Sequence, residues 1–98
     1  MIYNVVGRET IDGVSESVGF TAANIPPTKP NVIYALIQPT TAGVRVCIDG
    51  TTPTSTKGIK LLVNLFYEVW GSESLTNFRC IDDDGTADLE VIYFGSGG

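Results

Sequence analysis

Short stretches in which apolar and polar residues alternate run along most of this chain, with turn-forming residues between them. Val44, Val46 and Ile48 fall on one side of an extended backbone, which is the expected core side. Arg45 and Cys47 fall on the other side. The same alternation, with many β-branched and aromatic residues, predicts strands at 2–6, 16–21, 32–38, 43–49, 58–62, 66–70, 77–81 and 87–94. About eight such strands indicate an all-β fold, either a single antiparallel β-sandwich or a jelly-roll-like barrel.

The last predicted strand is apolar on both of its sides. Leu89, Val91 and Tyr93 form one apolar side, and Ile92 and Phe94 add apolar surface to the other. A strand with two apolar sides has neighbours that cover both of them. We therefore expect this strand to be central in its sheet or to be covered by a neighbour.

Turn-forming residues mark the connections between the predicted strands. Asp-Gly pairs and small polar clusters tolerate the positive φ angles of tight turns and predict hairpins; they stand at 12–13, 40–43, 49–50, 71–72 and 84–85. The connection at 22–30 contains Pro26, Pro27 and Pro30, which cannot donate backbone hydrogen bonds. We expect a long crossover there rather than a strand. The Gly/Ser tail at 95–98 is expected to be flexible.

One segment also carries a helical pattern. Between residues 59 and 70 the apolar residues recur at spacings of three and four, and a segment of this length would make about three helical turns. Its β-branched and aromatic content favours strands, with a helix as the alternative. The segment 71–76 is rich in serine and threonine and is interpreted as a polar turn.

The composition narrows the possible partners. A chain of 98 residues has the length of one domain, spanning 1–98. Six Lys and Arg against eleven Asp and Glu give a net charge of -5, which argues against a nucleic-acid partner because phosphate binding needs clustered basic residues. We find neither an apolar run of about 18 residues nor a signal peptide, so we expect no membrane partner and synthesis in the cytosol.

The sequence contains no recognisable catalytic or metal-binding motif. The chain has no histidine, which excludes Ser-His-Asp and Cys-His nucleophilic sites in their usual form. Cys47 and Cys80 lack the further ligands that a metal pair would need, and we expect both to be free thiols because nothing indicates an oxidising compartment. The prediction is a protein that is not an enzyme and has no cofactor and no metal.

Carboxylates offer two weaker candidate sites. The Asp-Asp-Asp-Gly run at 82–85 could hold Ca²⁺ through oxygen ligands, but adjacent like charges are better tolerated at a solvated hairpin tip, so we interpret it as a turn. A glycosidase-type pair would draw on Glu9, Asp12, Glu68 or Glu90. Any chain with eleven carboxylates offers such candidates.

Aromatic residues raise one binding hypothesis. Tyr67 and Trp70, beside Phe66, would form a sugar-stacking platform if they lay exposed on a sheet face. Packing in the core or at an interface is the alternative, and most such residues lie in those places.

A longer pattern of strands and turns extends over roughly residues 32–94. It runs through Ala-Leu-Ile-Gln-Pro-Thr-Thr-Ala-Gly-Val-Arg-Val at 35–46, Ile-Asp-Gly-Thr-Thr-Pro-Thr-Ser at 48–55, Gly58, Leu-Thr-Asn-Phe-Arg-Cys-Ile at 75–81 and Leu-Glu-Val-Ile-Tyr-Phe at 89–94. In this pattern Arg45 faces outward, and Arg79 stands where it could pair with a carboxylate. The pattern resembles the small β-sandwich virion structural proteins of tailed bacteriophages, of the capsid decoration or cement type.

The resemblance implies a structural virion protein, first of all a capsid decoration or cement protein that binds and stabilises the capsid shell. Its partners would be the major capsid protein or other virion proteins and further copies of itself, in a virion assembled in the host bacterial cytoplasm. The alternatives are a tail or head-to-tail joining protein and a carbohydrate- or receptor-binding β-sandwich module. The expected interaction surface comprises Pro26, Pro27, Pro30, Tyr67 and Trp70.

Overall fold

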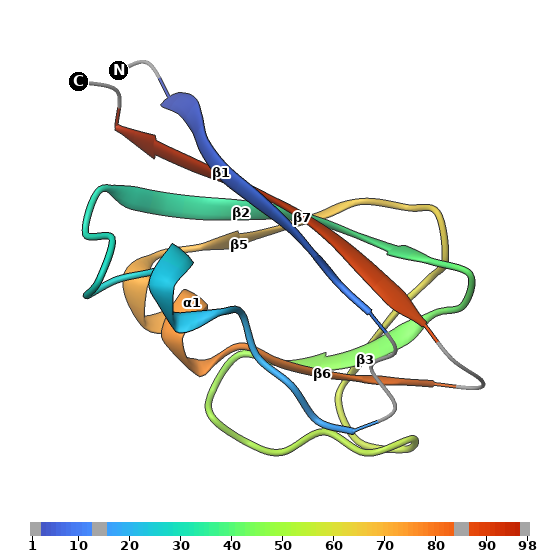
Figure 1. Ribbon diagram of the computed structural model, residues 1–98. Coiled ribbons are helices and arrows are strands. Elements are labelled where there is room, and N and C mark those ends of the chain that lie inside the picture. The colour runs from blue at the N-terminus through green and yellow to red at the C-terminus, as the bar shows by residue number, and fades with distance from the viewer. Residues whose placement is uncertain (1–2, 13–15, 84–86, 97–98) are drawn as a thin grey trace.

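Two antiparallel sheets make up most of the structure, a computed structural model that describes residues 3–12, 16–83 and 87–96 (Figure 1). In that part of the chain the strands are β1 (Tyr3–Ile11), β2 (Val32–Thr40), β3 (Val44–Cys47), β4 (Ile59–Leu61), β5 (Tyr67–Trp70), β6 (Arg79–Asp82) and β7 (Asp88–Ser96). The helices are the 3₁₀-helix η1 (Ala22–Asn24) and the α-helix α1 (Ser72–Asn77). The predicted all-β sandwich class is confirmed.

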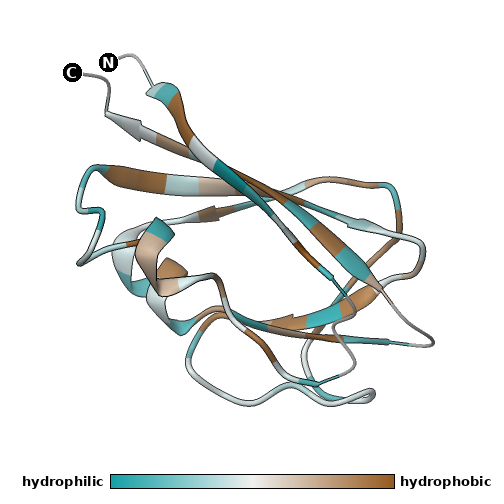
Figure 2. Cartoon of the chain, viewed as in Figure 1, coloured by the Kyte–Doolittle hydropathy of each residue, from teal (hydrophilic) through white to brown (hydrophobic). Residues whose placement is uncertain are grey.

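One sheet has the strand order β1-β7-β2-β5, and the other has the order β4-β3-β6. Strand β7 is central in its sheet, which is one of the two arrangements that its two apolar sides predicted, because it pairs with β1 along one edge and with β2 along the other. The inner side chains of β7 alternate with outer ones residue by residue, and Figure 2 shows hydrophobic and hydrophilic residues alternating along the strands. This alternation gives the four-stranded sheet a buried inner face and a second, outer face.

The core lies between the inner faces of the two sheets. Leu89, Val91 and Tyr93 of β7 are fully buried, and so is Val44 of β3 in the other sheet. The rings of Phe20 and Phe78 stack with centroids 4.1 Å apart and planes 7° from parallel. The other buried hydrophobic residues are Ile25, Val32, Ala35, Ile37, Val46, Leu61, Val69, Leu75, Cys80 and Ala87.

The predicted strand at 16–21 is wrong. Among the described residues of that segment, only Val18 pairs, through an isolated bridge in which it and Cys80 exchange backbone hydrogen bonds of 2.8 and 2.9 Å. A β-carbon at Gly19 would lie 2.8 Å from the carbonyl oxygen of Phe78, so the two backbones approach more closely than a regular ladder allows. The chain then turns inward and places Phe20 in the core.

Three predictions about the connections between strands and about the segment 59–70 are corrected by the structure. Residues 41–43 join β2 to β3, but these strands belong to different sheets, so the turn is a crossover and not a hairpin. The segment 71–76, expected as a turn, lies mostly in α1, whose Leu75 is fully buried. The alternative helix over 59–70 is wrong, because β4 and β5 form there.

Two further expectations about strand ends are corrected. Ile48, expected on the core side, is 44% exposed because β3 ends at Cys47 and the chain enters the Asp49-Gly50 turn, where Gly50 has φ +89°. Gly95 and Ser96, expected in a flexible tail, belong to β7 and pair with β1. The rest of that predicted tail, 97–98, lies outside the described residues.

The two cysteines are free thiols on opposite faces of the three-stranded sheet. Cys80 pairs with Val46 and points into the core, where burial raises the pKa of its thiol to about 12. Cys47 pairs with Arg79 on the other face. The guanidinium of Arg79 donates to the hydroxyl and carbonyl oxygens of Ser17, at 3.0 and 2.9 Å, rather than to the carboxylate that the sequence pattern suggested.

Candidate interaction surface

The outward side chains of the four-stranded sheet form a continuous, largely apolar surface, which we call the outer sheet face. Strand register places its residues in rows that cross β1, β7, β2 and β5 in that order. The first row holds Val5, Phe94, Tyr34 and Trp70, and the second holds Arg8, Ile92, Leu36 and Glu68. The third row holds Thr10, Glu90 and Gln38, with Phe66 just before β5 at its end, and Tyr3 adds a ring beyond the first row.

Aromatic rings stack across three strands in the first row. The centroids of Phe94 and Tyr34 are 4.7 Å apart and those of Tyr34 and Trp70 are 4.1 Å apart, with planes 5° and 15° from parallel. Because these distances match the roughly 4.8 Å spacing between strands, the rings stand upright on the sheet and turn their edges to solvent. Tyr3 adds edge-on contacts to Tyr34 at 5.8 Å and to Trp70 at 5.7 Å. The stack is a rigid apolar ridge, and Trp70 is 46% exposed at its end.

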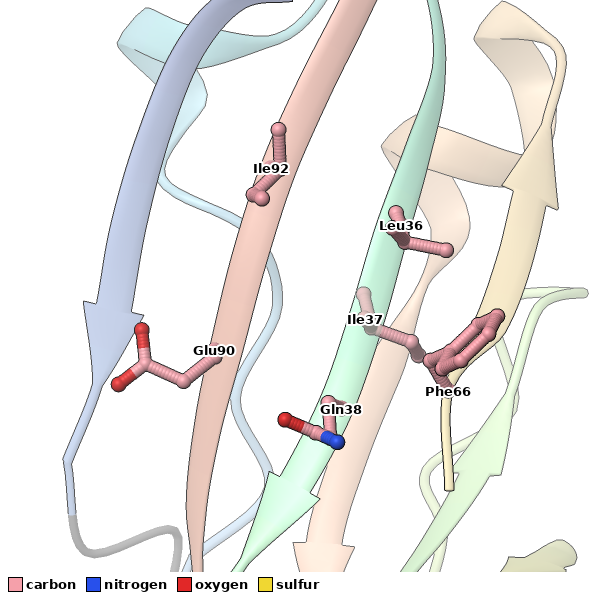
Figure 3. Close-up of a pocket in the computed structure, with 6 residues that line it drawn as sticks. All are labelled: Leu36, Ile37, Gln38, Phe66, Glu90 and Ile92. Carbon is pink, nitrogen blue, oxygen red and sulfur yellow. The ribbon is translucent and has the colours of Figure 1, made fainter. Parts of the chain in front are cut away.

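A shallow hollow of about 140 Å³ adjoins this ridge in the second and third rows. Figure 3 shows the side chains that line it, which come from β2, β7 and the residue before β5: Leu36, Ile37, Gln38, Phe66, Glu90 and Ile92. Phe66 is 69% exposed at one side of the hollow. The hollow is lined mainly by hydrocarbon, so it suits an apolar side chain of a partner better than a charged ligand.

The charged and polar groups of the outer sheet face lie around its apolar centre. Arg8 pairs with Glu90 at 2.9 Å, and the hydroxyl of Thr10 donates to the same carboxylate at 2.8 Å. At the opposite edge Glu68 accepts a hydrogen bond of 3.0 Å from the indole nitrogen of Trp70. An apolar centre with a polar rim is the anatomy of a protein–protein contact surface.

An apolar loop continues the surface beyond Phe66. Leu62, Val63 and Leu65 are each at least 38% exposed in the connection between β4 and β5. Asn64 holds this loop in place by donating its backbone N–H to the carbonyl of Pro39 at 2.8 Å. A run of consecutive apolar residues is visible in the sequence, but the competing strand and helix patterns over 59–70 hid the fact that it forms an exposed loop.

Tyr67 and Trp70, predicted to form one platform, lie on opposite faces of β5. Tyr67 points inward against the core, and its hydroxyl accepts a hydrogen bond of 3.1 Å from the N–H of Leu62. Trp70 points outward, with one face against Tyr34. Residues three apart in a strand point in opposite directions, so this spacing alone rules out a shared platform once β5 is known to be a strand.

The predicted surface around the prolines lies apart from the outer sheet face. Pro26 and Pro27 line an open hollow with Ser72, Glu73, Thr76 and Asn77 of α1. Figure 1 places η1 and α1 on the side of the four-stranded sheet that faces the second sheet. Pro30 is exposed in the same connection. Pro26 and Pro27 therefore lie beside α1. Trp70 lies beside the aromatic rings of the outer sheet face, those of Tyr3, Tyr34 and Phe94, and not beside the prolines.

The glycosidase-type carboxylates are not brought together. Glu68 and Glu90 lie on the outer sheet face, whereas Glu9 points inward from β1 and Asp12 is exposed beyond the end of that strand. Glu9 accepts hydrogen bonds from the N–H and hydroxyl of Thr21 at 3.2 and 2.6 Å, from the Asn24 amide at 3.1 Å and from the hydroxyl of Tyr93. This network fastens β1 to the segment that leads into η1, which is a structural role.

Protonation of Glu9 should destabilise the protein. Burial alone raises the pKa of this carboxyl, but the hydrogen bonds from Thr21, Tyr93 and Asn24 outweigh it, so the pKa lies below its ordinary 4.5. A lowered pKa means that the stabilisation is complete above pH 4.5 and is lost as the pH falls through the folded-state pKa. We expect Glu9→Gln to lower the free energy of unfolding by about 1–2 kcal/mol at pH 7.

Urea denaturation of both proteins across pH 2.5–7 checks this expectation, since titrations of the other carboxyls cancel in the difference between wild type and variant. The difference should be constant at neutral pH and should shrink in acid. A difference that stays the same down to the lowest pH would contradict the role given to the Glu9 carboxylate.

The predicted solvated turn at 82–85 is wrong for Asp83, whose carboxylate is held by two cations. It lies 3.1 Å from the guanidinium of Arg45 and 3.0 Å from the ammonium of Lys60, and its side chain is only 15% exposed. Hydrogen bonds from Lys60 and Arg45 lower the pKa of Asp83. Asp84 and Gly85 lie outside the described residues. Within residues 3–12, 16–83 and 87–96, no three metal-ligating side chains cluster.

No helix among the described residues has the length and apolar character needed to span a membrane. No protein-family model, curated protein or solved structure matches this chain.

Proposed function

We propose that this protein is a structural component of a tailed-phage virion, first of all a capsid decoration or cement protein, that acts through protein–protein contact. The observation that carries the proposal is the outer sheet face, where stacked aromatic rings and an apolar hollow occupy the solvent side of a sheet in a small domain. Exposed apolar patches of this kind mark interaction surfaces. The resemblance of residues 32–94 to small virion β-sandwich proteins supports a phage virion as the assembly to which the protein belongs.

The composition of the surface supports the same proposal. Only 17% of the residues are charged, and the long connection between β3 and β4 exposes Thr51, Thr52, Thr54 and Ser55. Charged residues are depleted at the centres of protein interfaces, so a surface with few charges and short side chains is suited to burial against neighbours. A protein that binds in many copies then reinforces a shell through mass action and multivalency.

A carbohydrate-binding function has less support from the geometry. A sugar-stacking platform needs aromatic rings that present a flat face to solvent. The rings of Phe94, Tyr34 and Trp70 stand upright against one another, and Tyr67 lies on the inner face. Glycan-array binding that is lost in Trp70→Ala, with the fold intact, would favour this alternative over the assembly function.

Purified particles provide the test of the proposed function. We expect hundreds of copies of the protein per particle, and we expect particles assembled without it to release their DNA at a lower temperature and after weaker osmotic shock. Adding the purified protein back should restore the stability of the particles, because a protein that binds the intact shell but not the disrupted shell stabilises the intact state. A handful of copies per particle would indicate a tail or joining protein, and unchanged particle stability would contradict reinforcement of the shell.

A further inference from the structure

We infer that the outer sheet face is the interface of a two-fold homodimer in which the four-stranded sheets of two copies pack face to face. The inference rests on the proposed function, in that it takes the outer sheet face as an assembly surface, and it names the occupant of that surface as a second copy of this chain. Strand order and the distribution of apolar and charged groups along the rows both favour a second copy as the partner.

The strand order defines the symmetry. A two-fold axis that lies between the four-stranded sheets of the two copies, parallel to the strands and midway between β7 and β2, reverses the order β1-β7-β2-β5 in the partner. It places β1 of one copy over β5 of the other and β7 over β2. Each row then faces the same row of the partner. The twist of the two sheets rotates this alignment by about 30°, as in other sheet-on-sheet packings.

The apolar groups complement one another under this operation. In the first row Phe94 faces the partner's Tyr34, and Trp70 faces the partner's Val5, which is 61% exposed in the single chain. In the second row Ile92 faces the partner's Leu36 close to the axis. Each hydrocarbon side chain of the centre therefore meets another hydrocarbon group, which is the requirement for favourable burial.

The charges at the two edges complement one another as well. Arg8 and Glu68 stand at opposite ends of the second row, so Arg8 of one copy faces the partner's Glu68, and the symmetry makes this pair twice. The Arg8 side chain is 66% exposed and uses one nitrogen on Glu90, which leaves further guanidinium donors for a second carboxylate. In the third row Glu90 faces the partner's Gln38, a carboxylate opposite an amide that can donate to it.

The sheet edges are less suited than the face to pairing with a second copy. Strand β1 has a bulge between Val5 and Gly7, and the Lys29 ammonium donates to the Val6 carbonyl there. At the other edge β5 has only four residues. A bulge, a lysine and a short strand are the features by which natural sheets avoid edge-to-edge association.

The size of the face sets the expected strength of the dimer. With about 3.3 Å per residue and about 4.8 Å between strands, the face measures roughly 25 Å by 19 Å, which is about 500 Å² of flat area per copy. Stable interfaces bury about 800 Å² of accessible surface per partner. Upright side chains raise the accessible area above the flat area, so the dimer falls at the small end of this range and should dissociate on dilution.

Sedimentation velocity of the purified protein over a dilution series tests the inference on the unmodified chain. We expect a reversible monomer–dimer equilibrium. The fluorescence of Trp70, the one tryptophan in the sequence, should shift to shorter wavelength as the dimer forms, because the indole is 46% exposed in the single chain and becomes buried. A protein that stays monomeric up to its solubility limit would overturn the inference.

Matched isoleucine variants locate the interface. Ile92→Asp places two carboxylates near the two-fold axis and should weaken the dimer by about 100-fold or more, whereas Ile48→Asp, on an exposed loop after β3, should leave it unchanged. Thermal melting checks that each variant folds. Equal weakening by both variants, or by neither, would contradict the assigned face.

A charge exchange provides a test that does not depend on a substitution in the centre. Arg8→Glu and Glu68→Arg alone should each weaken the dimer by about tenfold, and the double variant should recover part of the combined loss, because the pair is re-formed with its signs exchanged. The recovery is partial because the carboxylate at position 8 still lies beside Glu90 of its own chain. A double variant as weak as the sum of its parts would overturn the pairing. If the protein dimerises in solution but is absent from particles, the virion function is contradicted and the dimer is not. If the protein is abundant in particles but monomeric in solution, the dimer is contradicted and the virion function is not.

Discussion

Phe78→Ala should lower the free energy of unfolding by about 3–5 kcal/mol, the largest effect of any single substitution considered for this protein. Phe78 is 1% exposed, and its ring stacks on that of Phe20, which in turn contacts the ring of Tyr93 edge-on at 5.6 Å. Removing the ring leaves a cavity beneath the segment that carries Phe20, and the backbone of this segment pairs with a sheet through a single β-bridge.

A domain of this size has a total stability of about 5–15 kcal/mol, so the loss is a large share of it. We expect the melting temperature to fall by roughly 15 °C or more. Phe78→Leu, which keeps most of the buried hydrocarbon, is the matched control and should cost less than half as much. Calorimetry of the three proteins checks the ranking, and a Phe78→Ala protein as stable as Phe78→Leu would show that the stack contributes little.

Gly95→Ala should lower the free energy of unfolding by about 2–3 kcal/mol, although the change adds a single methyl group. A β-carbon at Gly95 would lie 2.5 Å from the backbone carbonyl oxygen of Asn31, which also accepts a hydrogen bond of 3.1 Å from the N–H of Ser96. The backbone of β7 and the chain entering β2 must therefore separate where Gly95 pairs with Val32.

Gly7→Ala separates this close approach from the general effect of replacing a strand glycine. A β-carbon at Gly7 would meet only side-chain atoms, the flexible end of Lys29 at 3.3 Å and the Tyr93 ring at 3.8 Å, so the variant should change the free energy of unfolding by less than about 1 kcal/mol. Urea denaturation of both variants measures the difference. If Gly95→Ala were no more costly than Gly7→Ala, the close packing of β7 against Asn31 would not constrain the fold.

Gly95 also affects the geometry of the outer sheet face. Gly95 precedes Ser96, which pairs with Tyr3, and it follows Phe94, which carries one ring of the aromatic stack. A displacement of β7 at this point would move Phe94 and Tyr3 relative to Tyr34. We expect Gly95→Ala to weaken the proposed dimer as well as the fold, whereas Phe78→Ala acts on the core alone.

Alternation along the chain was sufficient to predict the all-β class and the assignment of β4 and β5 as strands over a competing helix, and it left β7 either central in its sheet or covered by a neighbour. These features depend on local chemistry, because burying one or both faces of a strand requires apolar residues at every second position or at every position. The segment 16–21 has the same local pattern but does not form a strand, since a strand needs a neighbour along its length and only Val18 finds one.

The candidate surface was decided by the tertiary structure. Tyr67 and Trp70 were selected from the sequence as one platform, but Tyr3, Tyr34 and Phe94 come from strands that are distant in sequence and become neighbours of Trp70 only through the order β1-β7-β2-β5. By itself, the sequence determined which residues can lie on the same side of each strand. Strand order and register, which depend on how all the apolar faces are buried at once, determined which of those sides form a common surface.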